Sequence, residues 1–189
     1  GEIPVVLLDK DSLNGKPAVG LTVRWLGHST VLIEISSHRV LIDPVFSRYA
    51  SPVPGFVKRF SKAPVSADEL KGIDAVILSH DHYDHLEKDA IKSLSRSGAP
   101  FFVPAGVAAY LRKWGVPVGQ IRELTWWEES TLGTLKFICV PARHFSGRGL
   151  FTRNNTLWAG WIVQSETKNL YFSGDTGYAD HFKAIGDTY

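Results

Sequence analysis

Several features that often reveal a protein's class are scarce in this chain of 189 residues. It has a single cysteine, Cys139, which rules out an intrachain disulfide, and we expect this residue to be a small buried apolar group and not a ligand. The formal net charge at pH 7 is only +2, so we expect no nucleic-acid partner. No apolar run approaches the roughly 20 residues that span a bilayer. The stretch from Ile3 to Leu8 is too short for a signal peptide and lacks a basic leader.

Methionine is absent altogether. Because the chain begins with Gly1 and Glu2, we expect that its first residue is not a native start, and an upstream leader or anchor stays open. The compartment therefore stays open as well, between a soluble protein and one bound peripherally to a membrane. The oligomeric state is equally undetermined, a homodimer included.

Hydrophobic residues make up 44% of the chain, enough for a substantial core. Nothing resembles a linker or a repeat, so we expect one domain over residues 1–189, with residues 1–19 as an irregular arm or weak edge strand. The apolar runs predict an α/β fold in which a three-stranded meander precedes a βαβα alternation. The expected strands cover 21–26, 31–35, 40–43, 74–78, 101–103, 121–124, 135–141, 157–164 and 170–173; the expected helices cover 86–97, 105–114 and a last segment opened by 175–177.

The most informative stretch is an apolar run, typical of a buried strand, that ends in His80-Asp81-His82-Tyr83-Asp84-His85. Burying so many ionisable groups at a strand end is costly unless a charge satisfies them, and a divalent cation is the usual answer. An extended backbone would direct His80 and His82 to one point, and Asp84 and His85 to a second point nearby. Two metal ions about 3.5–4 Å apart would suit this spacing. Imidazole with carboxylate favours zinc, and iron or manganese would accept the same donors.

The pattern His-x-His-x-Asp-His after an apolar strand resembles the signature of the metallo-β-lactamase superfamily, and His80, His82, Asp84 and His85 match it residue for residue. The resemblance implies a four-layer αββα sandwich with metals at the edge where two sheets meet. It also implies a third histidine and a bridging aspartate, and His144 and Asp175 stand where these belong. The family's last ligand is a histidine further downstream, which this chain lacks, so we expect its C-terminal part to be truncated.

Within the superfamily the chain most resembles the branch of phospholipases D that hydrolyse N-acylphosphatidylethanolamine, together with its bacterial relatives. The similarity extends from residue 21 onward and is carried by Trp25-Leu26-Gly27-His28-Ser29-Thr30, Leu124-Thr125-Trp126-Trp127-Glu128-Glu129, Gly174-Asp175-Thr176-Gly177-Tyr178 and the array of His144, Arg148, Asn154, Leu157, Trp158 and Trp161.

The resemblance implies that His80, His82 and His144 hold one metal, that Asp84 and His85 hold the other, and that Asp175 bridges them. Asp84 and Asp175 thereby belong to the catalytic set, and a metal-bound hydroxide would attack phosphorus. Arg148 is the expected phosphate clamp because a guanidinium matches phosphate geometry, with Arg143 and Arg153 as weaker candidates.

Two further residues are expected near the metals. His28 lies in a glycine-flanked loop between strands and either contacts the substrate or the metal surroundings, or serves as a hydrogen-bonded structural histidine. Asp43 ends an apolar strand, and we expect its carboxylate to orient a metal-bound histidine, with an Asp-Pro turn as the alternative.

Residues 44–67 form a long irregular segment that has Arg48, Lys58, Arg59 and Lys62 and no acidic residue. Aromatic residues are interleaved with these cations, among them Phe46, Phe56 and Phe60. This composition suits an anionic lipid surface, so residues 44–62 are the candidate for peripheral membrane contact. The alternative is a solvated loop held on the core by its aromatics.

Three other functions share these metal residues. A lactonase or thioesterase would act on soluble substrates and would not need the lipid-compatible segment 44–67. A metallo-nuclease would need a basic channel, for which the scattered Lys and Arg residues give little support. A non-catalytic metal-binding domain is the third alternative, because the chain lacks the downstream histidine.

Overall fold

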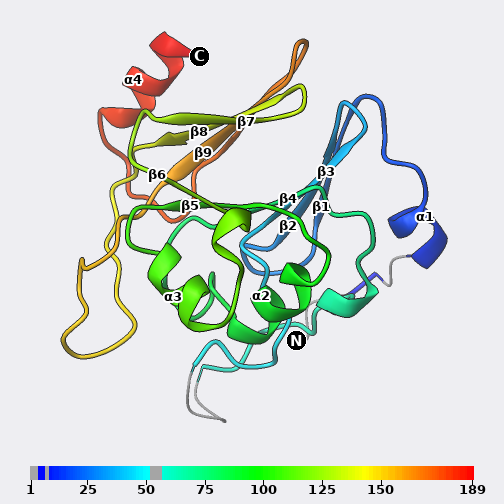
Figure 1. The fold of residues 1–189 in the computed structure, drawn as a ribbon, viewed down its shortest axis with the longest axis horizontal. Helices are drawn as coiled ribbons and strands as arrows, with labels where there is room; N and C mark the ends of the chain where they lie inside the picture. Colours follow the sequence, from blue (N-terminus) through cyan, green and yellow to red (C-terminus); the bar gives the residue numbers. More distant parts are fainter. Residues whose placement is uncertain (1–3, 7–8, 52–56) are drawn as a thin grey trace.

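The computed structural model describes residues 4–6, 9–51 and 57–189, and its strands form two sheets (Figure 1). The larger sheet has six strands in the order β1-β2-β3-β4-β5-β6. Strands β1 to β3 are an antiparallel meander, whereas β3 to β6 run parallel. These strands are β1 (Leu21–Trp25), β2 (Val31–Ile35), β3 (His38–Ile42), β4 (Ala75–Ile77), β5 (Phe101–Pro104) and β6 (Ile121–Leu124).

The smaller sheet has four antiparallel strands in the order β10-β9-β8-β7. They are β7 (Glu129–Leu132), β8 (Leu135–Val140), β9 (Gly160–Gln164) and β10 (Asn169–Phe172). The helices are α1 (Lys10–Asn14), α2 (Lys88–Ser95), α3 (Ala108–Lys113) and α4 (His181–Thr188), with short 3₁₀ helices at Ala67–Glu69 and Val118–Gln120.

Successive side chains of a strand point to opposite faces of its sheet, and this alternation explains how the two sheets pack. In β8, Phe137 and Cys139 face a core shared with the larger sheet, whereas Ile138 packs on the opposite side. In β3, Val40 and Ile42 face the same shared core, and Leu41 between them packs toward α2 and α3. Each sheet therefore buries one face against the other sheet and one face against helices.

The outer layers are amphipathic helices. Helix α2 buries Ala90, Ile91 and Leu94 against the larger sheet, and α4 places Ile185 against Ile138 of the smaller sheet. Figure 1 shows α2 and α3 on one side of the sheets and α4 on the other. This is the four-layer αββα sandwich that the sequence predicted. No helix in the described part of the chain combines the length and the apolar composition of a membrane span.

Several boundaries differ from the sequence prediction. The predicted irregular arm contains α1, because Leu13 is buried in the core beside α2. Strand β7 was not predicted, since three of its four residues are polar and it lies at a sheet edge. The last helix begins at His181 and not directly after Asp175. Strand β3 begins at His38, two residues before the predicted strand 40–43, and His38 pairs with Ile35.

Candidate metal centre

Seven side chains that can ligate a metal meet where four segments adjoin the ends of strands. Because β3 and β4 are parallel, the segments that follow them leave the sheet at one edge. The histidine-rich loop follows β4, and segments after β8 and β10 of the smaller sheet bring His144 and Asp175 to the same place. The loop between β1 and β2 adds His28.

The donors fall into overlapping groups in which all ligand atoms lie within 4.8 Å of one another. The groups are His80, His82 and His144; His80, His85 and Asp175; and His28, Asp84 and His85. One carboxylate oxygen connects them, since Asp175 Oδ2 lies 3.3 Å from His85 Nε2 and 3.8 Å from His144 Nε2. The structure thus brings together all six residues expected to bind metal, and adds His28 to them.

Three imidazoles make up the first group. His80 Nε2 and His144 Nε2 lie 2.8 and 3.3 Å from the same atom, His82 Nδ1. Burial and the adjacent imidazoles lower the pKa of His80 to about 2, and burial also lowers the pKa of His82 and His144. Three neutral imidazoles whose ring nitrogens converge are the ligand state that zinc requires.

The other two groups share His85, and each contains one carboxylate, Asp175 or Asp84. The hydrogen bond from His85 lowers the pKa of Asp175 to about 2. The pKa of Asp84 also lies below its usual range, because His28 and His85 outweigh the opposing effect of burial. Burial would lower the pKa of His85, but the carboxylates of Asp175 and Asp43 raise it to about 10. This part of the centre therefore attracts positive charge, which is the property a second divalent cation would use.

Asp43 supports the donors from behind. Its side chain is fully buried, with Oδ2 lying 2.8 Å from His85 Nδ1 and accepting a 2.6 Å hydrogen bond from the Ser79 hydroxyl. Its Oδ1 accepts the backbone N–H of Ser79 at 2.7 Å. These contacts direct Nε2 of His85 toward the centre, and the same Ser79 hydroxyl lies 2.9 Å from His80 Nδ1. The Ser79 contribution was not recognised from the sequence, where its only signal is a hydroxyl at the end of an apolar run.

Arg148, the expected phosphate clamp, contacts the backbone of the histidine-rich loop. One guanidinium nitrogen donates to the backbone oxygens of Asp81 and Leu86 at 2.7 and 2.8 Å, and more weakly to that of His82 at 3.4 Å. The guanidinium carbon lies 3.9 Å from the centre of the Tyr83 ring, and the Tyr83 hydroxyl donates to the backbone oxygen of Arg148. These contacts favour a role in holding the metal-binding loop, and the expected role in binding phosphate stays a prediction.

The other arginine candidates also point elsewhere. Arg143 is exposed and donates to the backbone oxygen of Tyr178, and Arg153 lies over the ring of Phe145. Cys139 is fully buried in the core between the sheets, as expected.

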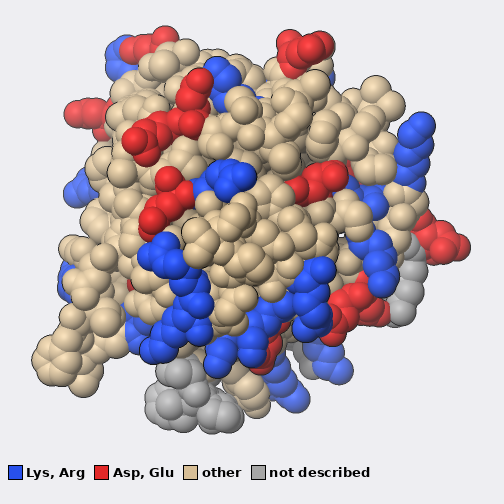
Figure 2. Space-filling view, in the orientation of Figure 1, with Lys and Arg blue, Asp and Glu red and all other residues tan. Residues whose placement is uncertain are grey.

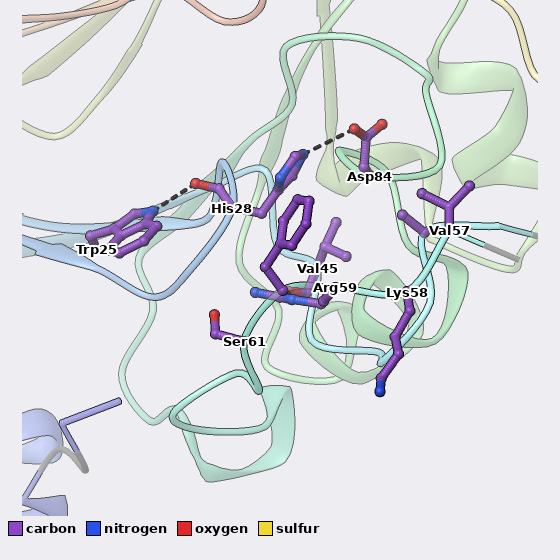
Figure 3. A pocket seen from close by; sticks show the side chains of 10 residues that line it. Trp25, His28, Val45, Val57, Lys58, Arg59, Ser61 and Asp84 are labelled. Atoms are coloured by element: carbon purple, nitrogen blue, oxygen red, sulfur yellow. Dashed lines mark hydrogen bonds and ion pairs between the residues drawn. The ribbon is translucent and has the colours of Figure 1, made fainter. Parts of the chain in front are cut away.

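A cavity of about 340 Å³ opens beside the donor group of His28, Asp84 and His85 (Figure 3). His28 lines it and lies 2.9 Å, Nε2 to Oδ2, from Asp84, another lining residue. The Trp25 indole N–H donates to the backbone oxygen of His28 at 2.6 Å, which holds the ring next to His28 at one end of the cavity. His28 was expected either to be a hydrogen-bonded structural histidine or to lie near the metals. It is hydrogen-bonded and also lies next to the metal donors. Segment 57–61 completes the cavity, and sequence reasoning identified its composition but not its place beside the centre.

A sequence profile described as the Beta-lactamase superfamily domain matches residues 38–189. An uncharacterized protein of Mycobacterium tuberculosis is 48% identical over 97% of this chain and 49% of its own length. An N-acyl-phosphatidylethanolamine-hydrolyzing phospholipase D of Caenorhabditis elegans is 35% identical over 98% of this chain and 54% of its own length. The chain therefore spans about half the length of these curated relatives.

Among solved structures, a metallo hydrolase from the archaeon Ignicoccus hospitalis superposes with a TM-score of 0.66 and is 25% identical, over 89% of this chain and 66% of the archaeal chain. The superposition agrees with the αββα layering described above. Since the profile also covers most of the chain, from β3 to its end, this protein belongs to the β-lactamase superfamily and has the metallo-β-lactamase fold.

Proposed function

We propose that this protein is a metal-dependent phosphodiesterase of phospholipase D type that hydrolyses lipids resembling N-acylphosphatidylethanolamine. The single observation that carries the proposal is the position of Asp175 Oδ2, within 3.3 Å of His85 Nε2 and 3.8 Å of His144 Nε2. One carboxylate oxygen within reach of two donor groups suits a pair of metal ions, and paired metals are typical of phosphoester hydrolysis. The similarity to the nematode phospholipase D supports the choice of substrate.

The chain's own residues have separable roles in this proposal. His80, His82 and His144 would hold one ion, Asp84 and His85 the other, and Asp175 would lie between them. Bound there, two zinc ions, or iron or manganese in their place, would supply a water ionised near neutral pH and positive charge opposite the phosphoryl oxygens.

Three side chains around the donors would keep this geometry. Asp43 fixes the ring of His85, and Arg148 fixes the backbone from Asp81 to Leu86. His28, which lies between Asp84 and the adjacent cavity, is placed to contact a substrate oxygen.

A lipid substrate also requires access to a lipid surface. Figure 2 shows Lys and Arg side chains gathered on the lower part of one face, over α2 and α3. Exposed cations on these helices include Lys88, Lys92, Arg112 and Lys113. In the segment 44–62, Phe60 is 90% exposed, whereas Phe46 packs on the core; Phe56 lies outside the described residues. Basic helices and an exposed phenyl ring support peripheral contact with an anionic membrane.

The test compares hydrolysis of N-acylphosphatidylethanolamine micelles with hydrolysis of a soluble lactone, using the protein at its full natural length. We expect turnover of the phospholipid and none in the His82→Ala variant, whose circular dichroism should match that of the unchanged protein. Turnover of the lactone alone would reject the phospholipase proposal in favour of a lactonase.

A further inference from the structure

We propose that the cavity beside His28 and Asp84 is the subsite for one apolar chain of an anionic amphiphile, so that Trp25 and Phe60 determine which chain length is preferred. This inference rests on the proposed function, because it takes the reacting group of the substrate to lie at the metal donors.

The walls of the cavity carry large apolar side chains. Trp25, Val57 and Phe60 line it and are 61%, 66% and 90% exposed, although each is a large apolar side chain. Apolar groups gathered around a concave surface are typical of a ligand site, because covering them removes apolar area from water. The polar edge of Trp25 is already satisfied by the backbone oxygen of His28, so its ring offers only an apolar surface.

The cavity is continuous with the metal donors. His28 and Asp84 line the cavity, and both belong to a group whose ligand atoms lie within 4.8 Å of one another. Figure 3 shows these two residues along one side of the cavity, with Trp25 and Val57 at its ends. A ligand whose phosphoryl group reaches the donors therefore directs its next atoms along Trp25 and Phe60.

Basic side chains in the cavity indicate that its ligand carries negative charge. Arg59 and Lys58 line the cavity as well. One nitrogen of the Arg59 guanidinium donates to the backbone oxygen of Val45, but Nη2 is buried and has no hydrogen-bond partner among the residues that the structure describes. A buried N–H without an acceptor favours a ligand oxygen in this cavity. An apolar wall beside a cationic floor suits an anionic amphiphile and not a neutral sugar.

The volume of the cavity suits a single acyl chain. At about 340 Å³ it lies at the small end of ligand pockets, so it would hold part of a single acyl chain and leave the remainder of a diacyl lipid outside.

The test measures binding separately from turnover. Isothermal titration calorimetry of the full-length protein with n-butyl, n-hexyl, n-octyl and n-decyl phosphonate, all below micellar concentrations, gives affinity against chain length. Each added methylene should raise the affinity about fourfold until the cavity is filled. In the Trp25→Ala and Phe60→Ala variants, each added methylene should raise the affinity by less than about twofold. Phe60→Ala guards against a folding defect, since this ring is 90% exposed.

Phe151→Ala is the matched control, because Phe151 is 93% exposed and does not line the cavity. It should retain the chain-length dependence of the unchanged protein. Equal dependence in all four proteins, or none in any, overturns the subsite. Chain-dependent binding without phosphodiester hydrolysis supports the subsite and overturns only the proposed reaction, so the two failures are distinguishable.

Discussion

Replacing Arg148 by methionine removes the guanidinium that fastens the metal-binding loop to the segment after β8. The side chain donates to the backbone oxygens of Asp81 and Leu86 at 2.7 and 2.8 Å, and these two residues lie on either side of the segment 82–85. A hydrogen bond from a charged donor contributes about 1.5–3 kcal/mol. Because the side chain is half-buried, water will satisfy part of what is lost, and we expect the free energy of unfolding to fall by about 2–4 kcal/mol.

The same change should loosen the metal donors. Asp81 and Leu86 bracket His82, Asp84 and His85, so their backbone positions set the direction of all three donors. Loss of such a supporting contact typically weakens metal affinity about 10–100-fold. Urea unfolding would give the stability, and competition with a chromophoric chelator would give the zinc affinity.

Two variants make the experiment specific to this role. Arg148→Lys keeps the charge but replaces the guanidinium nitrogen that reaches both oxygens by an ammonium group on a shorter side chain, and should give intermediate values. Arg153→Met changes an exposed arginine nearby in the chain and should shift stability by no more than about 0.5 kcal/mol. If Arg148→Met matched Arg153→Met in both stability and zinc affinity, the positioning role would be refuted.

Other changes test other parts of the structure. Asp43→Ala should weaken zinc affinity about 10–100-fold in the chelator assay, because His85 loses the partner that orients it; unchanged affinity would contradict this role. Phe137→Ala should lower the free energy of unfolding by about 3–5 kcal/mol in urea, since this buried ring stacks on Phe102 between the sheets; a loss below about 1 kcal/mol would count against the shared core. Glu34 is buried, which raises its pKa, but ion pairs with Arg24 and Arg39 more than offset this and lower the pKa from its usual 4.5. A lowered folded-state pKa means that the ionised Glu34 stabilises the protein above pH 4.5 and that this contribution is lost as the pH falls through the lower value. The stability difference between the unchanged protein and Glu34→Gln should therefore be largest above pH 4.5 and shrink below it, and a difference independent of pH would contradict the ion pairs.

The fold could be predicted largely from local pattern. Strands β2 and β6 were placed at their observed bounds; β2 is a largely apolar run, and β6 has apolar residues at both of its ends. Strand β7 and helix α1 were missed, since each depends on a neighbour: β7 on pairing with β8, and α1 on the burial of Leu13. Long-range partners of this kind leave little trace in a short stretch of sequence.

The centre was predictable for a different reason. Three of its histidines and Asp84 stand within six consecutive residues, so their chemistry is visible without the fold. Arg148 was expected to bind phosphate because its residue type suits phosphate, but its three backbone acceptors depend on the loop geometry that the chain adopts around it. The cavity at Trp25 and Phe60 could not be anticipated either, since these residues are 35 positions apart and meet only in the folded protein.

Metal content tests the central claim most directly. Elemental analysis of the protein at its full natural length, purified without chelators, should find two equivalents of zinc, iron or manganese per chain, because two donor groups converge on Asp175. The His82→Ala variant, still folded by circular dichroism, should retain fewer. A folded, unchanged protein that binds no metal even after incubation with zinc would contradict the account.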